Sequence, residues 1–183
     1  MRFGVCGNTE IGRAAAAVGF DFFEMTVGGF LKPRESEDAF QKALAEVRAV
    51  PIPCFALNCF LPGDLKVTGP AADLGALEAF AVTAFRRARE AGVKTIVFGS
   101  GGARNVPDGF ARVRADEQLL AFCRRLAPSA RQNGVTLVVE PLNRKECNIL
   151  NTVAEAAALV RAVNDPAIAL LADSYHWAVE KEP

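Results

Sequence analysis

The stretch NGVTLVVE, from Asn133 to Glu140, places a glycine, a nearly unbroken apolar run and a final acid next to one another. Glycine accepts the left-handed backbone conformation that ends many helices, so Gly134 predicts the end of a helix and the immediate start of a strand. An apolar run without alternation is typical of a parallel strand that is covered on both faces. The stretch therefore predicts a buried parallel strand whose carboxyl end carries Glu140.

The same arrangement occurs twice earlier, in VGFDFFE (18–24) and AGVKTIVFG (91–99), where Gly19 and Gly92 replace Gly134. Strand-like runs and helical stretches alternate along the whole chain. We expect strands near 2–6, 21–27, 52–58, 94–99, 135–140 and 167–173, and clear helices at 37–47, 76–91, 116–126 and 153–163.

Repeated βα units leave two main α/β architectures, a doubly wound open sheet and a (β/α)8 barrel of the TIM type. No GxGxxG or Walker loop follows the first expected strand, and polar groups instead follow strand after strand. This pattern favours the barrel, whose functional groups gather at the C-terminal face. A complete barrel typically needs about 250 residues. With about six βα units, residues 1–183 are expected to form one incomplete barrel domain that lacks the last strands.

Composition limits the classes of partner. The chain has 21 Lys and Arg against 21 Asp and Glu, a formal net charge of zero, and 51% hydrophobic residues. A chain without a basic surface is a poor ligand for a phosphate backbone, so we expect no nucleic-acid partner. No apolar run approaches the roughly 18 to 20 residues that span a bilayer, and the N-terminus does not resemble a signal peptide. We therefore expect no membrane partner and a cytoplasmic location.

The five cysteines form no CxxC pair and are expected to be free thiols. Cys6, Cys54 and Cys123 are interpreted as small buried residues. Cys59 and Cys147 lie near expected strand ends, where each could line a functional site.

Polar residues gather where the expected strands end. Carboxyl ends of parallel strands share one rim, which would collect Glu24, Asn58, Ser100, Glu140, Asp173 and His176. Carboxylates at neighbouring strand ends suit a divalent cation such as Mg²⁺ or Mn²⁺. The alternatives are solvated or salt-bridged acids for Glu140 and Asp173 and a packed or surface role for His176. Glu24 could contact a substrate or pair with Arg13 or another cation, and the pairing is favoured.

Two glycine- and proline-rich loops border the same rim. FGSGGARNVPDGF (98–110) contains Arg104, which could hold an anionic or polyhydroxyl substrate together with backbone N–H groups, or the loop could simply need glycine for its turns. NCFLPGDLKVTGP (58–70) is either a lid over a substrate or a surface loop. Asn58 and Arg104 are therefore candidate substrate-binding residues.

EPLNRKECNILNTVAEAAALV (140–160), followed by ALLADSYHW (169–177), resembles the sugar isomerase and epimerase family with a xylose isomerase-like barrel. This family includes ketose 3-epimerases and hydroxypyruvate isomerases. The resemblance implies that Glu140 is both a metal ligand and a catalytic acid or base, and that Asp173 is a second ligand. It also implies that Glu146 and His176 bind substrate oxygens, and that the metal is Mn²⁺, Mg²⁺ or Co²⁺.

The family's other two metal ligands, a histidine after strand seven and a glutamate after strand eight, have no counterpart in these 183 residues. That glutamate is also the second catalytic acid, so metal binding is expected to be weak or absent and turnover is in question. The resemblance implies a sugar or sugar-phosphate isomerase or epimerase that moves a proton next to a carbonyl through an enediolate. The alternatives are a non-catalytic sugar-binding remnant and an abasic-site endonuclease. The single histidine and zero net charge disfavour the endonuclease. Unpaired edges of the first and last strands further predict a homo-oligomer.

Overall fold

A computed structural model describes residues 1–183 as six parallel strands connected by helices. The strands pair strictly in chain order, from the first to the sixth, and every pair is parallel. Their bounds are β1 Gly4–Cys6, β2 Phe22–Thr26, β3 Cys54–Asn58, β4 Thr95–Phe98, β5 Thr136–Val139 and β6 Ile168–Leu170. A doubly wound sheet would reverse its strand order at a switch point. The uninterrupted order confirms the incomplete barrel type.

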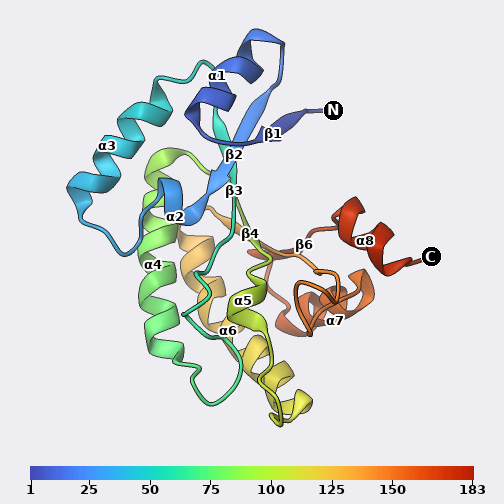
Figure 1. The fold of residues 1–183 in the computed structure, drawn as a ribbon. Coiled ribbons are helices and arrows are strands. Elements are labelled where there is room, and N and C mark those ends of the chain that lie inside the picture. The colour runs from blue at the N-terminus through green and yellow to red at the C-terminus, as the bar shows by residue number, and fades with distance from the viewer.

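The helices lie between the strands along the chain. Their bounds are α1 Thr9–Ala17, α2 Val27–Phe30, α3 Glu37–Arg48, α4 Leu74–Ala91, α5 Gly101–Arg104, α6 Arg112–Gln132, α7 Val153–Val163 and α8 Ser174–Glu180. In Figure 1, α3 and α4 lie on one side of the strands, and both ends of the chain lie on the other. No helix is both long enough and apolar enough to cross a membrane.

The three predicted glycine switches are confirmed. Gly19, Gly92 and Gly134 have φ values of +89°, +78° and +65°, and each directly precedes or begins the turn into a strand. A side chain at these positions would strain the backbone, because L residues rarely adopt this conformation. The glycines therefore explain how long helices reverse into strands within a few residues.

One helix is longer than its pattern predicted. The periodicity indicated 116–126, whereas α6 runs from Arg112 to Gln132 and contains Pro128. Pro128 is exposed, so the carbonyl that loses its helical hydrogen bond lies on the side where water can satisfy it. The buried face of α6, which includes Phe122 and Leu126, continues to pack against the core.

Aromatic rings fill the layer between the strands and the helices. Phe60 is fully buried, and its ring centroid lies 5.6 Å from that of Phe85 on α4 and 6.3 Å from that of Phe98 on β4. Phe98 in turn contacts Phe122 of α6 at 5.1 Å. This aromatic row joins α4, β4 and α6, and so fixes the backbone from which the rim loops after β3 and β4 emerge.

Candidate active site

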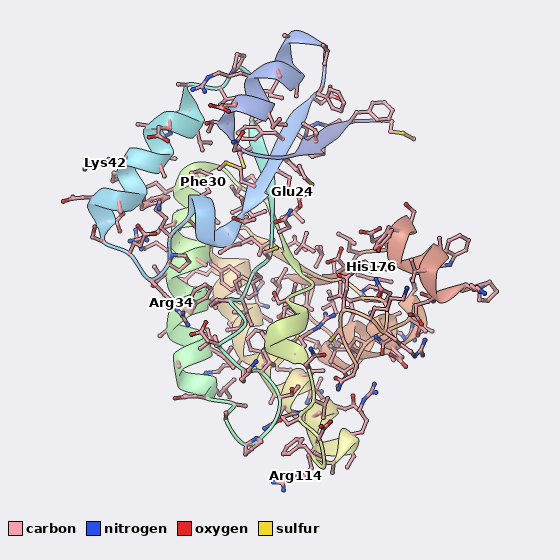
Figure 2. The ribbon with its side chains drawn as sticks, in the orientation of Figure 1. Glu24, Phe30, Arg34, Lys42, Arg114 and His176 are labelled. Atoms are coloured by element: carbon pink, nitrogen blue, oxygen red, sulfur yellow. The ribbon has the colours of Figure 1, made fainter.

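A cavity of about 780 Å³ opens where the strands end at their carboxyl sides. Its lining comes from the carboxyl ends of all six strands, and β1 contributes its last residue, Cys6. The polar members are Cys6, Glu24, Asn58, Cys59, Ser100, Glu140, Glu146, Asp173, Ser174 and His176. The structure thus brings together every candidate predicted for the rim. Figure 2 labels Glu24 on β2 and His176 on α8, which approach the cavity from opposite ends of the sheet.

Glu140, Asp173 and His176 form the one close group of potential metal ligands in the structure. Their ligand atoms all lie within 4.8 Å of one another. Glu140 directly follows β5 and Asp173 follows β6, and these strands are neighbours in register, with Val139 opposite Leu170. Parallel pairing therefore forces the two carboxylates together. Carboxylate oxygens are the ligands that Mg²⁺ and Mn²⁺ prefer, so the donor set fits a divalent cation.

The pKa of Glu140 is raised from 4.5 to about 7. Burial is the largest cause, and the negative charge of Asp173 is the next, whereas Arg104 acts in the opposite direction. A carboxyl with a pKa near neutrality can both accept and return a proton, as general acid and base catalysis requires. A cation between the two acids would relieve the same repulsion.

Asp173 also has a structural role. It is the N-cap residue of α8, where its Oδ1 accepts the N–H of Tyr175 at 2.7 Å. One carboxylate oxygen thus holds the start of the helix that carries His176. The interpretation of Asp173 as a strand-end acid with only structural partners accounts for this contact but not for the proximity of Glu140.

Hydrogen bonds within the polar loop after β5, residues 141–151, fix the conformation of that loop. Leu142 donates its N–H to the carbonyl of Leu150 at 3.1 Å, and the Asn151 amide donates to the carbonyls of Leu142 and Cys147 at 2.7 and 2.6 Å. Thr152 caps α7 by accepting the N–H of Glu155 at 3.1 Å. Much of the polarity that follows this strand therefore fixes the loop itself.

Glu146 and His176 are joined by a residue that the sequence did not single out. The Asn143 side-chain amide lies 2.8 Å from Glu146 Oε1 and 2.9 Å from His176 Nδ1. Asn143 and His176 are both buried, with 1% and 7% of their surface exposed. Loop and helix thus present Glu146 and His176 to the cavity as a connected pair. Neither periodicity nor spacing signals this role for Asn143, because its partner lies 33 positions away.

Arg104 is placed differently from its prediction. It is fully buried and does not line the cavity. Its Nη1 donates to the carbonyls of Phe98 and Glu140 at 2.9 and 2.8 Å, which ties the ends of β4 and β5 together. Burial lowers the pKa of this guanidinium from its ordinary value. This position does not support the predicted contact with substrate, because the guanidinium donates its hydrogen bonds to backbone carbonyls instead.

Glu24, a further acid of the rim, lines the cavity. It forms no salt bridge, so its predicted pairing with Arg13 or another cation is wrong. Asn58 also lines the cavity, where its Nδ2 donates to Cys6 Sγ at 3.9 Å and its Oδ1 has no protein partner. Ser100 accepts the N–H of Leu61 at 3.0 Å.

All five cysteines are free thiols, as expected. Cys54 and Cys123 are buried as predicted, but Cys6 is exposed, because the edge strand β1 ends at the cavity. Cys59 lines the cavity, whereas Cys147 is buried and does not. Desolvation raises the pKa values of the Cys6 and Cys59 thiols, and nearby Glu24 adds to both shifts.

The loop 58–70 is anchored along its length. Val67 donates its N–H to the carbonyl of Ala103 at 2.9 Å, and the Thr68 hydroxyl donates to the carbonyl of Arg104 at 2.8 Å. Leu61 and Gly63, at the near end, line the cavity. These contacts favour a fixed wall of the site over a free surface loop.

Comparison with known proteins agrees with this geometry. Residues 12–183 match the model of the xylose isomerase-like TIM barrel family. The chain belongs to this family. A crystal structure of D-psicose 3-epimerase in the presence of D-fructose superposes with a TM-score of 0.83 at 18% identity, over 100% of this chain and 67% of that one. An AP endonuclease of family 2 from Brucella melitensis superposes with a TM-score of 0.76 at 23% identity, over 96% of this chain and 69% of that one.

A sequence relative adds a local match. An L-ribulose 3-epimerase from Methylomonas sp. (strain DH-1) is 39% identical over 62 residues, which is 34% of this chain and 22% of the epimerase. This barrel chain thus spans about two thirds of the D-psicose 3-epimerase and matches a smaller part of the L-ribulose 3-epimerase. At these identities the two structural matches establish the fold.

Gly99 leaves the space that the Glu140 carboxylate occupies. A Cβ at Gly99 would overlap Glu140 Oε2, the mobile end of a side chain. We expect Gly99→Ala to fold normally but to displace the carboxylate and weaken Mn²⁺ binding by about 10- to 100-fold. Isothermal titration calorimetry measures the affinity. Gly28→Ala, where a Cβ meets no atom within 4 Å, is the matched control. Equal affinities for both variants would contradict this role of Gly99.

The raised pKa of Glu140 predicts a pH dependence of stability. The folded protein holds this proton more tightly than the unfolded chain, so stability from this group falls as pH rises from 4.5 to about 7. Glu140→Gln cannot ionise, so we expect its free energy of unfolding to fall less than that of the wild type over this range. Urea unfolding at about pH 5 and about pH 8 measures the difference.

The control for this measurement is Glu117→Gln, which changes an exposed carboxyl on α6. It should follow the wild type at both pH values. If Glu140→Gln also follows the wild type, the carboxyl does not titrate as described.

Proposed function

We propose that the chain carries the metal- and substrate-binding rim of a sugar or sugar-phosphate isomerase or epimerase. The observation that supports this most is the approach of Glu140 and Asp173 at adjacent strand ends, beside Glu146 and His176 in one cavity. The family includes proteins of this chemistry, and the matched stretch of L-ribulose 3-epimerase is consistent with it.

The residues have distinct roles in the proposed reaction. Glu140 removes the proton next to a substrate carbonyl and so produces an enediolate. Glu146 and His176 hold substrate oxygens in the same cavity. A divalent cation held by Glu140 and Asp173 would supply positive charge for the negative charge that develops on those oxygens. The carbon that is then reprotonated decides between epimerisation and isomerisation.

A sugar-binding role without turnover is the second candidate. It is favoured by the absence, in these residues, of a counterpart for the second catalytic acid that the family resemblance implies. Such a protein would use Glu146, His176 and Asn58 to bind a polyhydroxyl ligand. The endonuclease alternative shares the fold, but a net charge of zero gives the chain no overall attraction to the DNA backbone. A cytoplasmic location stays a prediction.

Turnover is the direct test of the enzymatic proposal. This chain, and a chimera in which the last two βα units of a ketose 3-epimerase follow Pro183, are assayed with Mn²⁺ and either D-fructose or L-ribulose. We expect epimerisation by the chimera, and a loss of about 100- to 10,000-fold in kcat for its Glu140→Gln variant. Glu117→Gln, on the outer face of α6, is the control and should retain activity.

Two results would change the proposal. Unchanged turnover by Glu140→Gln would remove Glu140 from its role. A folded chimera that binds a ketose but converts none would favour the sugar-binding candidate.

Association through the open sheet edges is the proposed quaternary arrangement. β1 and β6 end the strand order and do not pair with each other, and Leu170 of β6 and Trp177 of α8 are 37% and 43% exposed. Unpaired strand edges favour association. We expect light scattering to show a dimer that Leu170→Lys weakens, because a charge at the edge opposes pairing. Val113→Lys, at an exposed apolar residue of α6, is the control. A wild-type monomer at all concentrations would contradict the proposal.

A further inference from the structure

The orientation of the Asn143 amide is defined by its neighbours. Its Oδ1 accepts the N–H of Lys145 at 3.1 Å, so the other end of the amide is the NH₂ group. That group lies 2.8 Å from the Glu146 carboxylate and 2.9 Å from His176 Nδ1. An amide NH₂ has two hydrogens, and here each has one acceptor.

His176 Nδ1 faces a second donor. The backbone N–H of Asn143 points at the same ring nitrogen at 3.2 Å, and a backbone N–H can only donate. A ring nitrogen between two donors must offer its lone pair. A neutral imidazole carries one N–H, so the proton lies on Nε2.

We propose that Asn143 is a positioning residue that fixes His176 in the Nε2–H tautomer, so that His176 presents a hydrogen-bond donor to the cavity. A protonated Nε2 has no lone pair for a metal. Of the three clustered groups, Glu140 and Asp173 are then the ligands, and His176 belongs to the substrate.

The same amide sets the complementary role of Glu146. Because Asn143 donates to Glu146 Oε1, the carboxylate is held as an acceptor beside the histidine donor. The pair therefore suits a ligand with one oxygen that accepts and a hydroxyl that donates, as in a hydroxy-carbonyl compound. This identification of the ligand rests on the proposed function, whereas the tautomer does not.

Loop and helix are also locked together around this contact. The N–H of Arg144 donates to Glu180 Oε1 at 2.8 Å, and the Arg144 guanidinium pairs with the other oxygen of Glu180. Glu180 lies at the end of α8, so the helix that carries His176 is fixed to the loop that carries Asn143. A purely structural Asn143 would serve this docking too, and the ring tautomer is the property that distinguishes the two roles.

The single histidine of the chain makes the tautomer directly measurable. In protein labelled with ¹⁵N-histidine, one pair of ring nitrogens is observed by NMR at mildly alkaline pH. We expect a protonated, pyrrole-like Nε2 and a bare, pyridine-like Nδ1 in the wild type. A wild-type Nδ1–H tautomer overturns the proposal without any variant.

Asn143→Asp replaces the two donor hydrogens by an acceptor of the same shape. We expect the Nδ1–H tautomer to become populated at the expense of Nε2–H, because a charged carboxylate at the 2.9 Å side-chain position outweighs the remaining backbone N–H at 3.2 Å. The circular dichroism spectrum should be unchanged. Asn148→Asp is the matched control, because Asn148 lies in the same loop but its side chain contacts the backbone of Val106. It should keep the wild-type tautomer.

An unchanged tautomer in a folded Asn143→Asp protein overturns the role of the side chain. Adding D-fructose to the wild type tests the proposed function separately. A missing response of the ring nitrogens to the sugar would count against sugar binding, while the tautomer result would stand.

Discussion

The repulsion between Glu140 and Asp173 is the interaction around which the site is arranged. Glu140 directly follows β5 and Asp173 lies shortly after β6, so the parallel pairing of these two strands holds the carboxylates close. Burial raises the pKa of Glu140 to about 7, and the nearby negative charge of Asp173 adds to that shift. The repulsion between the two carboxylates is unfavourable in the folded state, and the binding of either a proton or a cation removes it. An acid that binds metal and moves protons requires this property.

Buried polar contacts keep that arrangement from relaxing. Arg104 holds the carbonyls at the ends of β4 and β5, and Gly99 leaves room for the Glu140 carboxylate. Asn143 connects Glu146 to His176, and Asn151 closes the loop from which both Asn143 and Glu146 extend. Groups that are fixed in advance in this way need no rearrangement when a ligand binds.

Several features followed from local sequence because local physics decides them. Gly19, Gly92 and Gly134 predicted the helix ends, since few other residues accept a positive φ. The apolar runs predicted parallel strands, and parallel strands predicted one shared rim. Glu140, Asp173 and His176 were therefore expected at one rim, and the family resemblance added Glu146 to them. The family resemblance gave them roles, and the match over residues 12–183 supports the family.

The sequence by itself determined which segments form strands and which acids follow them, because each depends on a few neighbouring residues. Only the tertiary structure decided the partners that lie far apart in the chain. Arg104, predicted at the substrate, is buried on backbone carbonyls, and Cys6, predicted in the core, is at the cavity. Asn143 was not predicted at all, because its contact with His176 exists only when the loop after β5 meets the helix after β6. Long-range packing sets such contacts, and no local pattern encodes them.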